Sequence, residues 1–257
     1  MLQVREVGAA VVSAAPPRSL ALAQLMMQLL RTLAELSVHP ACVAPLMQAL
    51  SPLAAAKSPV LLQMQALRLL CRMWQHNHRC FSTLKAALVA KDSTNVETSV
   101  EMRLARAACV LDVCTDDPVK GTELVLLIQS GLQDSLPGVV ALHLQSLCTL
   151  CEEDVVDFYT AWRVVRKLVP TLPDDTQAGA AWLRLLGCGG LDARLHEPIA
   201  TPLLASLWHG SDAACPHVRA AAAAALLCFG ADTVDELLAT ALSRYAPLQC
   251  TMCKNNV

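Results

Sequence analysis

The feature that most constrains the fold of this chain is an internal repeat marked by three prolines. Pro59, Pro137 and Pro216 lie 78 and 79 residues apart. Each proline follows an apolar stretch and is followed by a valine and a run of helix-forming residues. Proline fits the first turn of a helix, where its missing N–H costs nothing. The pattern therefore predicts one helix that ends before each proline and a second helix that begins at it.

Two further helix pairs fall between these units, over residues 80–114 and 157–188. The sequence thus predicts a helix pair about every 40 residues, which is the HEAT and armadillo period. Each pair buries only part of its apolar surface internally, so the neighbouring pair must cover the rest. We therefore expect an all-α, HEAT/armadillo-like α-solenoid of antiparallel helix pairs.

The expected boundaries follow from this period. The predicted second helices of the pairs are residues 19–36, 58–75, 99–115, 138–153, 175–188 and 217–230, and the predicted first helices are residues 41–54, 80–91, 120–133, 157–169, 197–209 and 233–244. The small residues Ala222 and Ala225 predict close approach between helices. Around the array (residues 19–245) we expect a frayed segment, 1–18, and a tail, 246–257. Neither end resembles a polar capping repeat, which favours a piece of a longer solenoid.

The composition argues against several classes of protein. A net charge of -2 gives no basic field for nucleic acid. The longest uncharged stretch, residues 36–56, is interrupted by Pro40, Pro45 and Pro52, so we expect no membrane span. The first 20 residues lack the pattern of a secretory signal, and a cytoplasmic protein is expected.

The twelve cysteines are predicted to be reduced and buried rather than paired in a disulfide framework. Five of them recur near the ends of the predicted second helices at intervals of 43, 37, 37 and 40 residues, namely Cys71, Cys114, Cys151, Cys188 and Cys228. The Cys148–Cys151 CxxC pair lies in an apolar helix and is interpreted as core. Cys250 and Cys253 offer two zinc ligands where a structural site needs four. No metal and no cofactor are expected.

No motif points to catalysis. His76, His78 and Cys80 form a small cluster that fits a solvated turn. The acidic run 152–154 also fits a solvated turn at the end of a helix. There is no glycine-rich phosphate loop and no nucleophile elbow. The chain is therefore expected not to be an enzyme, although separated residues could still converge in a folded pocket.

One predicted helix, residues 157–169, stands out as a candidate partner-binding site. Aromatic residues are concentrated at its start, and Arg163, Arg166 and Lys167 follow. Tryptophan and arginine are enriched at binding hot spots. The alternative is that the aromatic rings fill the core and the three cations form an ordinary solvated face.

The segment LCTLCEEDVVDFYTAWRVVRKLVP, residues 147–170, resembles the focadhesin family of very large helical-repeat proteins. The similarity extends over most of residues 19–245. It implies a cytoplasmic, non-enzymatic scaffold or adaptor at focal adhesions, with an adhesion component such as vinculin, or further repeats of its own array, as partner. The chain is only a fraction of the family length, and its ending, PLQCTMCKNNV, looks like an abrupt or alternative terminus. The residues alone also fit an adaptor of a transport or RNA-turnover complex that binds a helix or disordered segment in its concave groove.

Overall fold

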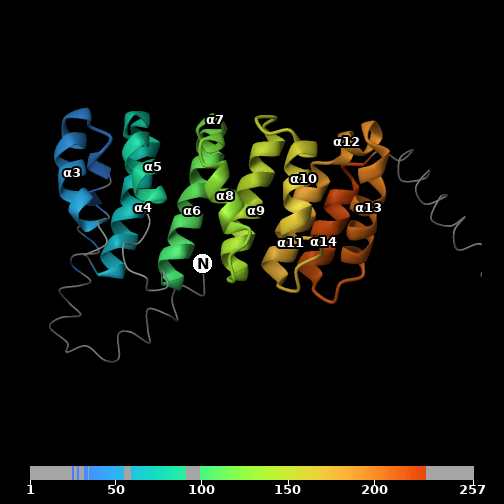
Figure 1. Cartoon of the computed structure of the whole chain (residues 1–257). Helices are drawn as coiled ribbons and strands as arrows, with labels where there is room; N and C mark the ends of the chain where they lie inside the picture. The colour runs from blue at the N-terminus through green and yellow to red at the C-terminus, as the bar shows by residue number, and fades with distance from the viewer. Residues whose placement is uncertain are drawn as a thin grey trace, which may run out of the picture. The chain divides into compact units, whose positions relative to one another are not determined.

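The computed structural model describes residues 25, 28, 32–33, 35–54, 59–90 and 99–229. These residues form helices and their connections, and they contain no strand (Figure 1). The helices are α3 (Pro40–Leu53), α4 (Val60–His76), the 3-10 helix η1 (His78–Cys80), α5 (Phe81–Val89), α6 (Val100–Asp116), α7 (Pro118–Thr122), α8 (Val125–Gly131), α9 (Pro137–Glu152), α10 (Phe158–Leu168), α11 (Thr176–Gly187), α12 (Gly190–Leu195), α13 (Glu197–Ser211) and α14 (Pro216–Leu226).

The chain divides into two compact units, residues 1–109 and 110–257. The division falls inside α6. The single array predicted over residues 19–245 stays a prediction. The frayed segment 1–18, the helix 233–244 and the tail 246–257 lie outside the described residues, as does most of the helix predicted at 19–36.

In the first unit, α4 packs against α3 and α5 (Figure 1). Trp74 and Met73 of α4 are fully buried. The Trp74 ring meets His78 edge-on at a centroid distance of 5.6 Å and lies 6.0 Å from Phe81. Trp74 therefore anchors the turn that connects α4 to α5.

Helix α3 confirms the helix predicted over residues 41–54. It runs through Pro45 and Pro52, so the expectation that these prolines interrupt the stretch is wrong at both positions. Leu46 and Leu50 are buried on the side that packs against α4, and Pro52 lies in the last turn. Packing thus holds the helix together where local preference disfavours it. α3 is 14 residues long. Within the described ranges, no helix combines the length and apolar character needed to cross a membrane.

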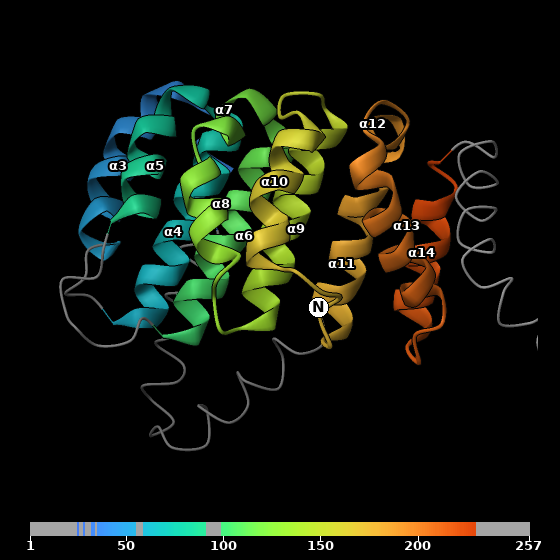
Figure 2. The same ribbon diagram turned by 45° about the vertical axis from the view of Figure 1, so that its right-hand side comes forward.

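In the second unit, α11 lies between α9 and α14 and packs against both (Figures 1 and 2). α13 packs against α14, and α12 packs against α13. Trp182 and Leu183 of α11 are almost completely buried. The close approach predicted at Ala222 and Ala225 is confirmed, because both are buried and a Cβ on Gly187 would lie 3.1 Å from the Cα of Ala225.

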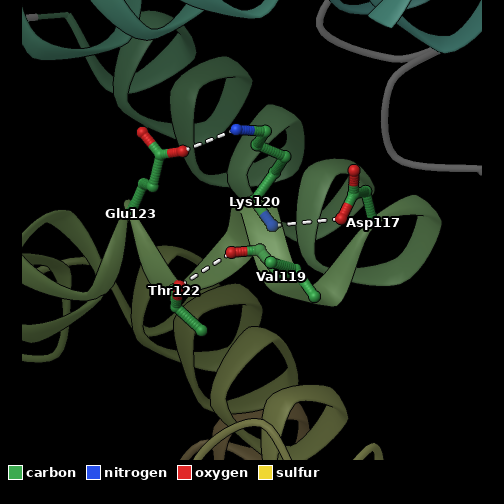
Figure 3. Close-up of polar contacts among 5 residues, drawn as sticks. All are labelled: Asp117, Val119, Lys120, Thr122 and Glu123. Carbon is green, nitrogen blue, oxygen red and sulfur yellow. Dashed lines mark hydrogen bonds and ion pairs between the residues drawn. The ribbon is translucent and has the colours of Figure 1, made fainter.

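The helix predicted over residues 120–133 is wrong in detail, because the structure forms α7 and α8 instead. α7 begins earlier than predicted: the Asp117 carboxylate accepts a hydrogen bond from the backbone N–H of Lys120 at 3.1 Å, and Pro118 occupies the first helical position (Figure 3). Both features are preferred at a helix N-terminus.

The break between α7 and α8 comes at Leu124, whose backbone angles, φ -103° and ψ 5°, leave the helical region. Its side chain is 1% exposed, so the bend places a leucine in the core. Close by, Lys120 forms a 2.9 Å ion pair with Glu123, and the Thr122 hydroxyl donates to the Val119 carbonyl (Figure 3).

The remaining predicted helices form close to their expected positions. The predicted ranges 58–75, 99–115, 138–153, 175–188 and 217–230 correspond to α4, α6, α9, α11 and α14. α12 was not predicted. It begins at Gly190, where a Cβ would lie 2.4 Å from the Cys228 carbonyl oxygen, so only glycine fits this approach.

Candidate functional site

The start of α10 is fixed by a side-chain cap. The Asp157 carboxylate accepts a 2.8 Å hydrogen bond from the backbone N–H of Thr160. Hydrogen bonds from Thr160 lower the pKa of Asp157, so this carboxylate stays ionised at the positive end of the helix. Tyr159 stacks on His196, with ring centroids 4.4 Å apart. These contacts set the orientation of the helix that carries the predicted partner site.

One face of α10 is buried. Phe158 and Trp162 are 5% and 6% exposed, and their rings stack at a centroid distance of 6.4 Å. Trp162 also stacks on Trp182 of α11 at 6.0 Å. The two rings therefore belong to the core, as the alternative interpretation of the aromatic cluster expected.

The opposite face of α10 carries Arg163, Arg166 and Lys167, and all three are exposed. Their spacing of three and four residues places them together on one side of the helix. Exposed Val164 lies beside them. Within residues 99–229 none of the three cations has an ion-pair partner. We call Arg163, Arg166 and Lys167 the α10 basic face.

A second group of chemically active side chains lies between α9 and α11. The sulfurs of Cys148 and Cys188 are 3.6 Å apart. The Cys148 thiol also donates to the Glu152 carboxylate at 3.4 Å. One ligand atom from each of these residues lies within 4.8 Å of the other two, and no other group of this kind occurs among the described residues. We call Cys148, Glu152 and Cys188 the Cys–Glu cluster.

The two thiols of the cluster titrate differently. The hydrogen bond with Cys188, followed by burial, raises the pKa of the Cys148 thiol. The same hydrogen bond lowers the pKa of Cys188, so the first proton leaves from Cys188. Burial raises the pKa of neighbouring Cys151 to about 12. Cys151 is therefore a poor nucleophile at neutral pH.

Sequence reasoning missed the Cys–Glu cluster. The predicted repeat aligns Cys151 with Cys188, which are 37 residues apart. In the structure the sulfur of Cys188 instead contacts the sulfur of Cys148, 40 residues apart. Both cysteines of the CxxC pair are buried in α9, as expected of core residues. Glu152 is exposed, as a solvated turn predicts, yet its carboxylate also reaches the Cys148 sulfur. The signal that could have found the cluster is a second cysteine spacing equal to the repeat length.

The other thiols agree only in part with the predicted burial, because Cys42 and Cys215 are half-buried and Cys228 is exposed. None of the ten described cysteines forms a disulfide. Cys228, however, is exposed and not part of the core, because it lies just beyond the last turn of α14. Of the predicted turn cluster, Cys80 is buried while His76 and His78 are exposed, and these residues do not converge.

The chain is similar to focadhesins along part of its length. The family described as Focadhesin/RST1, DUF3730, matches residues 19–197. Focadhesin of Danio rerio is 29% identical over 195 residues, which is 72% of this chain and 11% of that protein. Focadhesin of Homo sapiens is 28% identical over 58% of this chain and 8% of its own length. No solved structure matches the chain.

The described residues thus define an all-helical protein whose helices bury one another's apolar faces. Because the family match covers more than half of its residues, the chain belongs to the Focadhesin/RST1 family. It spans about a tenth of the length of the curated focadhesins that it matches.

Proposed function

We propose that this chain is a HEAT/armadillo-like segment of a focadhesin-like scaffold that binds other proteins and catalyses no reaction. The helices α4, α6, α9, α11 and α14 begin at residues 60, 100, 137, 176 and 216. This interval of about 40 residues supports a solenoid of antiparallel helix pairs. Solenoids of this kind present long surfaces to protein partners.

The α10 basic face is the observation that carries the binding proposal. The buried rings of Phe158 and Trp162 hold the helix against its neighbours, so the cations project from a rigid support. A preorganised cationic surface loses less entropy on binding than a mobile one. The chemistry of Arg163, Arg166 and Lys167 fits an acidic segment of a partner protein.

The family relationship supports a proposal for the cellular location and for the identity of the partner. A focadhesin-like protein is proposed to act in the cytoplasm at focal adhesions, and an adhesion component such as vinculin is the partner we propose. No catalytic role is proposed for the buried thiols Cys114 and Cys151, because burial raises the pKa of each to about 12 and makes them poor nucleophiles at neutral pH.

The test is binding of purified vinculin to the 257-residue chain. The variant Arg163→Glu, Arg166→Glu, Lys167→Glu reverses the α10 basic face. The matched control reverses three other exposed cations, Arg72→Glu, Arg79→Glu and Arg184→Glu, and has the same net charge.

Binding by the wild type and the control, with a loss of at least about tenfold in the α10 variant, supports the proposal. Equal loss in both variants would show a nonspecific charge effect and would contradict a specific α10 site. Capture of transport or RNA-turnover factors in place of vinculin from a cell lysate would favour the alternative adaptor function.

A further inference from the structure

We propose that the Cys–Glu cluster is a Zn²⁺ site that links α9 to α11, with Cys148, Cys188 and Glu152 as the three protein ligands. The proposal goes beyond protein binding, because it assigns a metal to the contact between the second helices of two successive predicted pairs. It rests on the spacing of the three ligand atoms and on the electrostatics of the place where they meet.

The spacing of the donor atoms fits tetrahedral zinc. With Zn–S bonds of about 2.3 Å, two sulfurs of a tetrahedron lie roughly 3.8 Å apart, and a sulfur and a carboxylate oxygen roughly 3.5 Å apart. The observed distances are 3.6 Å for Cys148 Sγ to Cys188 Sγ and 3.4 Å for Cys148 Sγ to Glu152 Oε1. The third pair of atoms, from Cys188 and Glu152, lies within 4.8 Å. Small side-chain rotations would bring all three donors onto one ion.

The backbone keeps these donors together. Cys148 and Glu152 are four residues apart in α9, so both side chains project from the same face. Cys188 is the C-cap of α11, which packs directly against α9. The ligands therefore come from two helices whose packing is already fixed, and the metal would need little reorganisation to bind.

The surroundings favour a cation over a pair of thiolates. Glu152 is the last residue of α9, and Cys188 follows the last residue of α11, so the negative ends of two helix dipoles meet here. The Cys188 sulfur also faces two backbone carbonyls, those of Cys148 at 4.0 Å and Arg184 at 3.8 Å. Carboxylate, carbonyls and helix ends all repel an added negative charge, whereas a divalent cation would offset two of the three negative charges of the two thiolates and the carboxylate.

The cluster is exposed to solvent at one of its three residues, so solvent can supply the ion and a fourth ligand. Cys148 is buried, Cys188 is half-buried and Glu152 is exposed, so the cluster opens to solvent on the Glu152 side. Zinc sites with three protein ligands complete their tetrahedron with water. Two thiolates with one carboxylate favour Zn²⁺ over Mg²⁺ or Ca²⁺, which prefer oxygen ligands only.

The experiment measures metal binding by the full chain in a Cys250→Ser, Cys253→Ser background, which removes the CxxC pair of the tail. Zinc content is measured after dialysis, and Co²⁺ is titrated as a spectroscopic probe. We expect one Zn²⁺ per chain and a cobalt spectrum with sulfur-to-metal charge-transfer absorption.

Three variants in this background test the ligands. Cys188→Ser is expected to abolish the charge-transfer band of the site, and Glu152→Gln to weaken Zn²⁺ binding at least about tenfold. Cys228→Ser, which removes an exposed cysteine beside Gly187 that is not one of the three ligands, is expected to bind as the background does. Zinc is expected to raise the unfolding temperature of the background and of Cys228→Ser, but not of Cys188→Ser.

Because Glu152 is exposed, Glu152→Gln is expected to fold like the metal-free background, so its weaker binding reports the ligand and not the fold. Equal zinc affinity of Cys188→Ser and the background would overturn the proposal. So would a reduced chain that takes up no metal although peptide mapping finds Cys148 and Cys188 as thiols.

Discussion

Gly131, the last residue of α8, gives His143 of α9 the space for its ring. A Cβ on Gly131 would lie 1.9 Å from Cδ2 and 2.1 Å from Nε2 of His143. The histidine is 5% exposed, and its Nδ1 has no hydrogen-bond partner within the described structure. Burial therefore keeps His143 neutral at neutral pH. Its ring occupies the space that a side chain at position 131 would need.

Gly131→Ala should destabilise the chain by about 1–3 kcal/mol, because the imidazole must leave its position in a packed core. The direction is diagnostic, since alanine normally stabilises a helix relative to glycine by about 1 kcal/mol. Urea unfolding followed by circular dichroism measures the change. Gln129→Ala, at an exposed position of the same helix, is the control and should be close to neutral.

Combining Gly131→Ala with His143→Ala tests the contact itself. If the two residues compete for one space, the double variant should lose clearly less stability than the sum of the single variants. If the stability losses of the two single variants simply add, the cost of Gly131→Ala arises from a contact other than that with the His143 ring.

Stability should fall as the pH is lowered from about 6.5 to about 4, because burial lowers the pKa of His143 from 6.5 to about 4. In this window the unfolded chain binds a proton that the folded chain excludes, so the free energy of unfolding rises with pH. The His143 contribution is complete above pH 6.5, and about 3 kcal/mol of it is lost by pH 4.

The measurement for His143 is the free energy of unfolding of wild type and His143→Gln across this pH range. Carboxylates titrate in both proteins, so the difference between the two slopes isolates the histidine. Parallel pH profiles would mean that His143 accepts a proton in the folded state as readily as in the unfolded chain.

Ala225→Leu should destabilise the contact between α11 and α14 by about 1–3 kcal/mol through overpacking. Ala225 is 3% exposed, and its Cα would lie 3.1 Å from a Cβ on Gly187. Ala223→Leu makes the same change at an exposed position of α14 and should leave the unfolding temperature nearly unchanged. Similar losses in the two variants would argue against close packing at Ala225.

Trp162→Ala should cost about 3–5 kcal/mol, since it removes a large ring packed between Phe158 and Trp182. Lys167→Ala, on the α10 basic face, should cost no more than about 1 kcal/mol, the favourable interaction of a cation with the helix C-terminus. Thermal and urea unfolding compare the two. A large loss for Lys167→Ala would place the α10 basic face in the folding core and weaken the case for a binding role.

Much of the helix pattern could be predicted because it depends on local chemistry. Proline at a first helical position, as at Pro137 and Pro216, marks a helix start in the sequence itself. The apolar face of α10 and its exposed cations also follow from the helical period. The similarity to focadhesins could be recognised from residues 147–170, and the family match confirms it.

Other features depend on contacts between residues far apart in the sequence. The separation of α7 from α8 places Leu124 in the core, and no local signal requires it. The helix predicted over residues 41–54 continues through Pro45 and Pro52, and packing against α4 maintains it where proline is locally unfavourable. The free energies of local helix preferences are smaller than the free energy gained by burying a few leucines. Tertiary packing therefore prevails where the two conflict.

The sequence by itself determined where most helices lie and which of their faces are apolar, because these properties arise from neighbours within a few turns. Only the tertiary structure decided that Cys188 meets Cys148 and that Glu152 joins them. The register between two packed helices is set by how side chains across the contact interlock, and a shift of three residues would have paired Cys188 with Cys151 instead.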